Sequence, residues 1–292
     1  MAQQAFLERV RSGQILVSDG ATGSNLQQRG LGKGVSAEAW VLDQPEQILR
    51  LHRDFLAAGA DILLTCTFGG TPLRLQHAGL ASRAEEINRR AAALAKQAAG
   101  DKALVAGSIG PTGLMLQPFG PLSESEAQAA FAAQARTLAD AGVDFLVVET
   151  QFDLGEARAA LLGARSACSL PLVCSFSYDR GTRTMMGVKP AQMAAEFADL
   201  ADVLGINCGR SLEENLGALQ ALRAATDKPI WFKPNAGLPE LDAQGAPVYS
   251  VTPAEMGARV PDWISAGAQI VGGCCGTSPA HLAAISQAVK KD

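Results

Sequence analysis

The chain has 292 residues, of which 48% are hydrophobic and 18% charged, a composition typical of a globular protein with a sizeable core. Its net charge of −4 at pH 7 gives no indication of a nucleic-acid or anionic-membrane surface. No apolar run is long enough to span a bilayer, and residues 1–9 predict an amphipathic helix rather than a signal peptide. We therefore expect a cytoplasmic protein that binds neither nucleic acid nor membrane.

Short apolar runs recur along the chain, each followed by a polar or glycine-bearing turn and a helical pattern. The eight runs are 15–17, 62–64, 104–106, 145–148, 172–174, 203–206, 230–232 and 270–271. They are continuous rather than alternating, which is typical of parallel strands buried on both faces. Amphipathic alanine-rich segments between them predict helices, among them 85–99, 123–141 and 212–225. The second of these opens with Ser123 and Glu126, which fit a capping box.

Eight strand–helix units in a chain of this length predict an α/β fold, a (β/α)8 TIM barrel that forms a single domain over residues 1–292. The alternative is a doubly wound open sheet. Such a sheet usually has fewer strands, and no dinucleotide-binding fingerprint follows the first run. No linker divides the chain, and we interpret the glycine- and proline-rich stretch 235–253 as a long loop between a strand and a helix.

Three cysteines follow apolar runs at positions where a barrel carries its chemistry, the carboxyl ends of the strands. Cys208 follows the sixth run, and the adjacent Cys274 and Cys275 follow the eighth, in a glycine turn before a predicted helix start at Pro279. The sixth and eighth strands are two apart in a barrel, so these thiols can meet near its mouth. Three thiolates with an open fourth position are typical of a catalytic zinc site, whereas the alternative is that they are small buried hydrophobic residues. Such a site suits the activation of an incoming thiol.

Two carboxylates, Asp19 and Glu149, end otherwise apolar runs. In a barrel mouth they could hold an ammonium group or act as general acid and base, although Asp19 could also be a surface residue or a helix N-cap. The successive amides of Gly20, Ala21 and Thr22 could receive a carboxylate. Together these groups would bind an α-amino acid, whose side-chain thiol could then reach the zinc.

The remaining cysteines are Cys66, Cys168 and Cys174. We interpret Cys168 and Cys174 as packing residues of the fifth helix and strand. For Cys66, which ends the second run, a position near the metal and a packing role are both open, and we favour packing.

The chain resembles the homocysteine S-methyltransferase family in six motifs, which occur in order over essentially its whole length. They lie at 19–21, 107–112, 149–153, 205–208, 234–239 and 272–277. The Gly-Gly-Cys-Cys-Gly-Thr element at 272–277 is highly specific. The elements at 149–153 and 234–239 are most similar to the homocysteine-binding module of cobalamin-dependent methionine synthase, and less similar to betaine-homocysteine or S-methylmethionine enzymes.

The resemblance implies a (β/α)8 barrel that converts homocysteine to methionine, with zinc (Zn2+) bound by Cys208, Cys274 and Cys275. It implies that L-homocysteine is held through Asp19, Glu149 and the backbone of Gly20 and Ala21. We also expect Thr22 and Asn207 to bind this substrate. The methyl donor would be a methylcorrinoid, either methylcobalamin or a separate corrinoid protein, or a sulfonium such as S-methylmethionine. Related sequences often carry Asn in place of Cys66 and Glu in place of Leu64, so this chain departs from the family pattern at this part of the rim.

Three alternatives stay open from the sequence. The first is a methyltransferase component of a corrinoid-dependent system that acts on a substrate other than homocysteine. The second is a zinc- or thiol-based redox-sensing barrel without turnover, which would not need the two carboxylates of an amino-acid site. An aldolase-type barrel using Lys233 is less favoured, because no phosphate-binding glycine turn stands apart from the cysteines.

Overall fold

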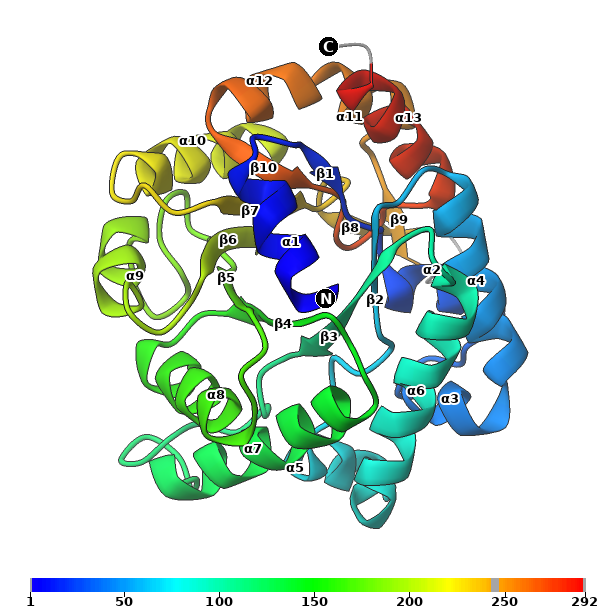
Figure 1. Cartoon of the computed structure of the whole chain (residues 1–292), viewed down its shortest axis with the longest axis vertical. Coiled ribbons are helices and arrows are strands. Elements are labelled where there is room, and N and C mark those ends of the chain that lie inside the picture. Colours follow the sequence, from blue (N-terminus) through cyan, green and yellow to red (C-terminus); the bar gives the residue numbers. More distant parts are fainter. Residues whose placement is uncertain (1, 243–246, 291–292) are drawn as a thin grey trace.

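The computed structural model describes residues 2–242 and 247–290, in which the eight predicted runs form one parallel sheet (Figure 1). The strand order is β1-β10-β7-β6-β5-β4-β3-β2. The strands are β1 (Leu16–Val17), β2 (Ile62–Leu64), β3 (Leu104–Ile109), β4 (Phe145–Gln151), β5 (Leu172–Phe176), β6 (Val203–Cys208), β7 (Ile230–Pro234) and β10 (Ala268–Val271). Each strand pairs with the next one along the barrel, and this order is that of a (β/α)8 fold.

The first and second strands meet and close the sheet into a barrel. Ser18 forms an isolated parallel bridge with Ile62. Next to it, the Asp61 N–H donates to the Val17 carbonyl at 2.7 Å. The predicted TIM barrel is therefore confirmed, and the open doubly wound sheet is not formed.

Helices surround the sheet (Figure 1). They are α2 (Thr22–Gln28), α3 (Ala39–Asp43), α4 (Pro45–Ala57), α5 (Pro72–Leu75), α6 (Ala84–Ala99), α7 (Glu124–Asp140), α8 (Leu154–Ala167), α9 (Pro190–Glu196), α10 (Leu212–Arg223), α11 (Pro253–Ala258), α12 (Val260–Ser265) and α13 (Pro279–Val289). The capping box predicted at Ser123 and Glu126 starts α7, and α13 begins at Pro279 as predicted. No helix within the described residues is long and apolar enough to cross a membrane.

The N-terminal end of the barrel is closed by α1 (Ala2–Arg11), the amphipathic helix that the sequence predicts. Figure 1 shows α1 in front of the barrel strands. The Phe6 ring stacks on Phe145 with 3.8 Å between centroids, and Phe145 meets Trp231 edge to face at 6.3 Å. These rings belong to an apolar cluster that fills the inside of the barrel. Their burial stabilises the fold at the end opposite the predicted chemistry.

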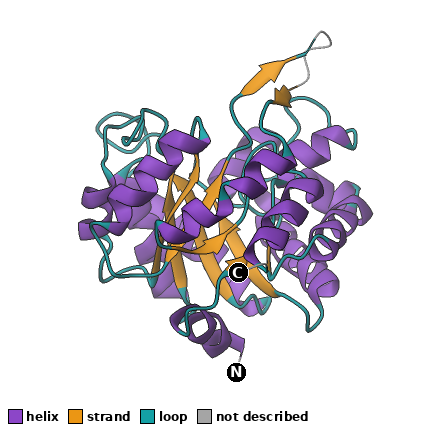
Figure 2. Ribbon diagram, turned by 90° about the horizontal axis from the view of Figure 1, so that it is seen from above, coloured by secondary structure: helices purple, strands orange, loops and turns teal. Residues whose placement is uncertain are grey.

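The stretch 235–253 differs from the long loop that we expect, because it contains a two-stranded antiparallel hairpin. Its strands are β8 (Pro239–Leu241) and β9 (Pro247–Tyr249). Figure 2 shows the hairpin projecting from the end of the molecule opposite the N-terminus. Glycine and proline indicate a loop here, but edge strands of a short hairpin tolerate proline. The hairpin contacts the cysteine turn, because Tyr249 packs on Gly276, where any Cβ would overlap its ring.

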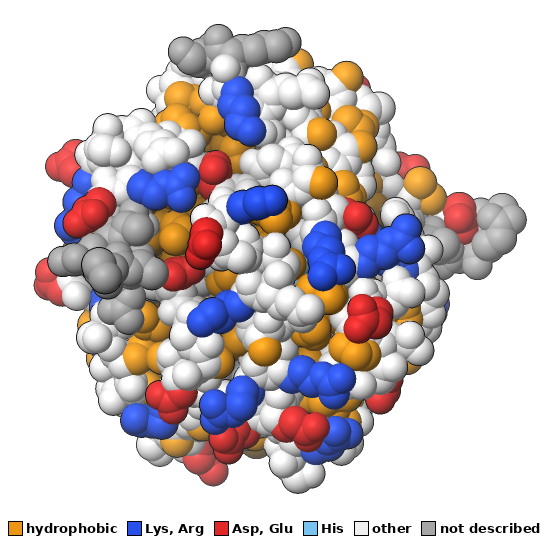
Figure 3. All heavy atoms as spheres, turned by 45° about the vertical axis from the view of Figure 1, so that its right-hand side comes forward, with side chains coloured by type: hydrophobic (Ala, Val, Ile, Leu, Met, Phe, Trp, Pro, Cys, Tyr) orange, Lys and Arg blue, Asp and Glu red, His pale blue; other side chains and the backbone are white. Residues whose placement is uncertain are grey.

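Basic and acidic side chains are interspersed over the face shown in Figure 3. This distribution agrees with a chain whose net charge is only −4. Together with the small net charge, it gives no support to a polyanion-binding surface on this face.

Candidate metal and substrate site

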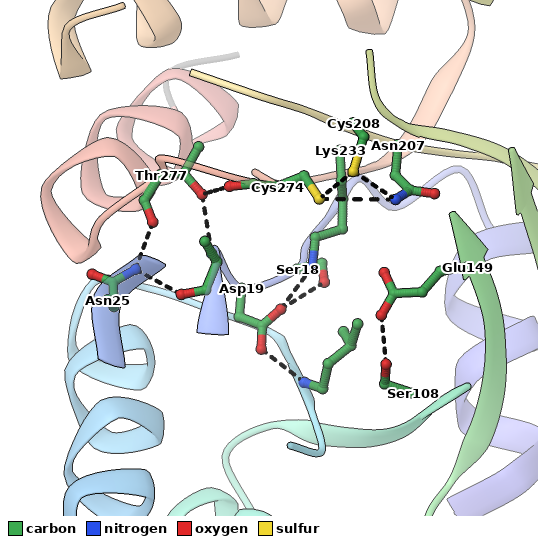
Figure 4. A network of polar contacts seen from close by, with 12 residues as sticks. Ser18, Asp19, Asn25, Ser108, Glu149, Asn207, Cys208, Lys233, Cys274 and Thr277 are labelled. Carbon is green, nitrogen blue, oxygen red and sulfur yellow. Dashed lines mark hydrogen bonds and ion pairs between the residues drawn. The ribbon is translucent and has the colours of Figure 1, made fainter. Parts of the chain in front are cut away.

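The structure brings Cys208, Cys274 and Cys275 together at the carboxyl ends of β6 and β10, which flank β7 in the sheet. Their three sulfur atoms all lie within 4.8 Å of one another, and those of Cys208 and Cys274 are 3.0 Å apart (Figure 4). Cys208 and Cys274 are half-buried, whereas Cys275 is exposed. The cluster therefore lies at the barrel mouth, within reach of molecules that enter from that side.

Main-chain bonds from the end of β7 hold the two cysteine turns. The Asn235 N–H donates to the carbonyl of Cys208 at 3.2 Å, and the Cys274 N–H donates to the carbonyl of Pro234 at 2.9 Å. Cys208 itself has a positive φ of 62° and is followed by Gly209 at 80°. The chain thus turns sharply at Cys208, which places its thiol beside the one from β10.

The three thiols cannot all ionise when no cation is present, because they are so close together. Hydrogen bonds from Cys208 and Cys274 lower the pKa of the Cys275 thiol. The hydrogen bonds to Cys274 and Cys275, together with burial, raise the pKa of the Cys208 thiol well above its usual range. A bound cation would remove this conflict by favouring all three thiolates.

The donor set fits a soft metal ion. Three sulfur ligands from the chain match a zinc site with an open fourth position, and thiolates do not suit the harder metals. The cysteine turn also has a buried oxygen beside it: Asn235 Oδ1 has no hydrogen-bond partner within the described residues. An unpaired buried oxygen is costly, and its presence here is consistent with a site built to be occupied.

A buried ion pair that sequence reasoning missed lies below the thiols. Lys233 Nζ is 2.8 Å from Asp19 Oδ1, and both side chains are at most 3% exposed (Figure 4). Asp19 Oδ2 accepts a hydrogen bond from the Leu64 N–H at 2.8 Å. Asp19, for which we expect a role in ammonium binding, thus already has a cation and an N–H as partners. The available signal was the lysine at the end of an apolar strand, which requires a buried partner.

Glu149 has one carboxylate oxygen without a hydrogen-bond partner among the described residues. Its Oε1 accepts a hydrogen bond from Ser108 Oγ at 2.5 Å, whereas its Oε2 has no protein partner within the described ranges. Burial raises the pKa of Glu149 to about 7, against the lowering effect of Lys233. Figure 4 shows the side chain pointing from β4 towards Lys233 and the cysteines. Glu149 can therefore accept a hydrogen bond from a cationic ligand beside the thiol cluster.

The turn 20–22 lies where the sequence places it, after β1 and at the start of α2, but the N–H of Ala21 is already used. The Ala21 N–H donates to Thr277 Oγ1 at 3.1 Å, and Ala21 is the N-cap of α2. Gly20 is closely covered, since a Cβ there would lie 2.7 Å from the Phe55 ring. Glycine at this position leaves room for the aromatic ring under the turn.

The other predicted residues fall into two groups. Asn207 is fully buried and bonded to Thr150 and Ser175, so it lies behind the cysteines. Cys66 is buried and its Sγ contacts the Ala37 carbonyl at 3.6 Å, outside the three-thiol cluster. Cys174 is buried within β5, and Cys168 lies at the end of α8. The preference for packing roles at these three cysteines is confirmed.

A closed parallel barrel that gathers thiols and carboxylates at its strand ends has the architecture of an α/β-barrel enzyme. Residues 16–289 match the family model described as homocysteine S-methyltransferase. The chain belongs to the homocysteine S-methyltransferase family, which confirms the resemblance read from its motifs. Membership of this family gives no support to the alternative of a redox-sensing barrel without turnover.

Several known proteins are similar to the chain over most of its length. The methionine synthase of Mycobacterium tuberculosis is 31% identical over 299 residues, which cover 96% of this chain and 25% of that protein. The methionine synthase of Mycobacterium leprae is 30% identical, with 95% and 24% covered. The chain thus spans about a quarter of the length of these curated relatives. A metallated crystal form of the homocysteine methyltransferase MmuM from Escherichia coli superposes with a TM-score of 0.82 at 27% identity, covering 98% of this chain and 99% of that one.

Proposed function

We propose that the protein transfers a methyl group to the thiol of L-homocysteine in a zinc-dependent reaction, giving methionine. The observation that carries the proposal is the cluster of Cys208, Cys274 and Cys275, whose sulfurs lie within 4.8 Å at the barrel mouth. Membership of the homocysteine S-methyltransferase family supports the acceptor. The polar groups beside the cluster support an amino-acid ligand.

Zinc bound by the three cysteines would lower the pKa of the homocysteine thiol and leave its sulfur nucleophilic at neutral pH. The chain's own residues position the amino acid. Glu149 Oε2 accepts a hydrogen bond from the α-ammonium group, and the turn 20–22 faces the α-carboxylate. Asp19 lies below the thiols, where its side chain is held by the ion pair with Lys233.

Holding the acceptor thiol in one place is the chain's main contribution to the rate, because positioning removes much of the entropy cost of a bimolecular step. The methyl group must arrive in line with the thiol from the open mouth, since α1 closes the other end of the barrel.

The methyl donor in this proposal is a methylcorrinoid, as methylcobalamin or on a separate corrinoid protein, or else a sulfonium such as S-methylmethionine. The motifs at 149–153 and 234–239 favour the corrinoid, as do the relatives named methionine synthase. The similarity to a solved structure named homocysteine methyltransferase leaves the sulfonium donor open.

The deciding experiment incubates zinc-loaded protein with L-homocysteine and either methylcobalamin or S-methylmethionine, and quantifies methionine. Methionine formed from methylcobalamin, together with the matching change in the cobalamin spectrum, supports the corrinoid donor. Methionine formed only from S-methylmethionine supports the sulfonium donor. No product with either donor, while another thiol is methylated, would favour a corrinoid system with a different acceptor.

The same assay tests the metal site through Cys208→Ser, which should lose tight zinc binding and turnover together. Cys174→Ser is the matched control, because Cys174 is buried outside the cluster and should leave zinc affinity unchanged. Full activity of metal-free Cys208→Ser protein would contradict the proposed mechanism.

A further inference from the structure

We propose that Asn207 is a positioning residue, which directs its side-chain nitrogen at two of the clustered thiols and holds in place the strand ends that carry the metal and amino-acid sites. The proposal rests on the proposed function, because it takes the thiols as metal ligands. Asn207 lies on β6 and is 0% exposed. It was expected to bind homocysteine, but its hydrogen-bonding atoms all have partners within the chain.

The contacts of the Asn207 amide determine its orientation. Its Oδ1 accepts hydrogen bonds from the Thr150 N–H at 2.9 Å and from Ser175 Oγ at 2.6 Å. Its Nδ2 donates to Thr150 Oγ1 at 2.7 Å. Because a main-chain N–H can only donate, the oxygen must face Thr150 N and the nitrogen must face the other way.

The nitrogen that is fixed in this way points at the cysteines. Asn207 Nδ2 lies 3.4 Å from Cys208 Sγ and 3.8 Å from Cys274 Sγ (Figure 4). A hydrogen bond from an amide to a thiolate draws negative charge away from the sulfur. Groups that bond to metal ligands in this manner orient the ligands and tune the metal. Asn207 is therefore placed to set how much charge two of the three sulfurs donate.

Asn207 also connects two strained backbone positions. Thr150 has φ of 59° and Cys208 has φ of 62°, and no other non-glycine residue in the described ranges has a positive φ. Such backbones are strained and persist only where the surrounding structure holds them. The side chain of Asn207 bonds to both the main-chain N–H and the side-chain hydroxyl of Thr150, and Asn207 directly precedes Cys208.

The two strained residues belong to the two halves of the site. Thr150 directly follows Glu149, which has the oxygen free for an ammonium group, and Cys208 carries a thiol of the cluster. One buried amide thus fixes the distance between the amino-acid site and the thiol site. Its loss should disturb the metal site even in the absence of any substrate.

The test compares wild-type protein with Asn207→Asp, which keeps the shape but replaces the N–H donors with a carboxylate facing the sulfurs. We expect zinc affinity, measured by competition with a chromophoric chelator, to fall by about 10- to 100-fold, the usual effect of removing such a partner. In cobalt-substituted protein the sulfur-to-cobalt charge-transfer band should shift. Ser175→Ala is the matched control, because it removes a bond to Oδ1 and leaves Nδ2 facing the sulfurs.

If Asn207→Asp does not fold, Asn207→Ser, which removes the amide without adding charge, takes its place in the same measurements. Wild-type zinc affinity and an unshifted cobalt band in the folded variant, with only the KM for homocysteine raised, would overturn the proposal and indicate a substrate contact instead. None of these measurements uses a methyl donor. A wild-type protein that fails to bind zinc would therefore refute the proposed function, whereas an unaffected variant would refute only the role of Asn207.

Discussion

The two ends of the same eight strands differ in character, since one end is packed with apolar rings and the other carries polar and thiol groups. At the N-terminal end, Phe6, Phe145 and Trp231 pack ring against ring in an apolar interior closed by α1. At the C-terminal end, the strands finish in a buried ion pair, a carboxylate with an unpaired oxygen and three crowded thiols. The second end consists of features that cost free energy, and the packed end supplies the stability that lets them persist.

The largest effect that would test this contrast is expected from Lys233→Met at the C-terminal end. The substitution leaves the Asp19 carboxylate buried without its cation, so the free energy of unfolding should fall by about 4 kcal/mol. Denaturant unfolding of the metal-free wild type and variant measures this change in the free energy of unfolding.

The control for this change is the double variant Lys233→Met with Asp19→Asn. Removing both charges together should restore most of the lost stability, because no unpaired buried charge remains. A double variant as unstable as the single one would show that Lys233 acts through packing against Trp231, whose ring centroid lies 5.5 Å from Nζ, rather than through its charge.

Phe6→Ala tests the other end, where we expect a loss of about 3 kcal/mol from the removed ring and the cavity left behind. Zinc affinity of the folded variant should stay within a factor of two or so of wild type, because α1 touches the opposite end of the strands. Chemical unfolding and chelator competition measure the two quantities. Weakened zinc binding in folded Phe6→Ala protein would mean that the two ends are coupled.

A smaller effect is expected in the pH dependence of stability, through Glu149. Burial raises its pKa to about 7 from an ordinary value of 4.5, so the folded protein holds this proton more tightly than the unfolded chain does. The resulting stabilisation is complete below pH 4.5 and is lost as pH rises towards 7. Relative to Glu149→Gln, the free energy of unfolding of metal-free wild type should fall by about 2 kcal/mol between a pH below 4.5 and pH 6. Parallel stability curves for the two proteins would contradict the raised pKa.

Much of the fold could be predicted because parallel barrel strands are buried on both faces and appear as continuous apolar runs. The cysteine cluster could be predicted for a related reason, since all such strands end on one rim and Cys208, Cys274 and Cys275 each follow a run. The hairpin at 239–249 could not, because its strands are only three residues long and carry prolines.

The pairings inside the site also escaped prediction. Lys233 and Asp19 are 214 positions apart, and no local pattern shows that a lysine ending one strand will meet a carboxylate ending another. We expect Asn207 to bind the substrate, but the sequence does not show which partners its amide has within the chain. Its bonds to Thr150 and Ser175 depend on the register of three neighbouring strands, which the sequence does not reveal.

The closure of one end by α1 has a consequence for the order in which molecules enter and leave. With the N-terminal end filled, the acceptor and the methyl donor must pass through the same opening. Glu149 and Asp19 are buried, whereas Cys275 is exposed, so in the proposed reaction the amino acid would occupy the deeper position. The acceptor must therefore bind before the donor, and the methylated product must leave after the spent donor. Initial-rate kinetics should accordingly show a compulsory-order pattern, with excess donor trapping the product in the barrel.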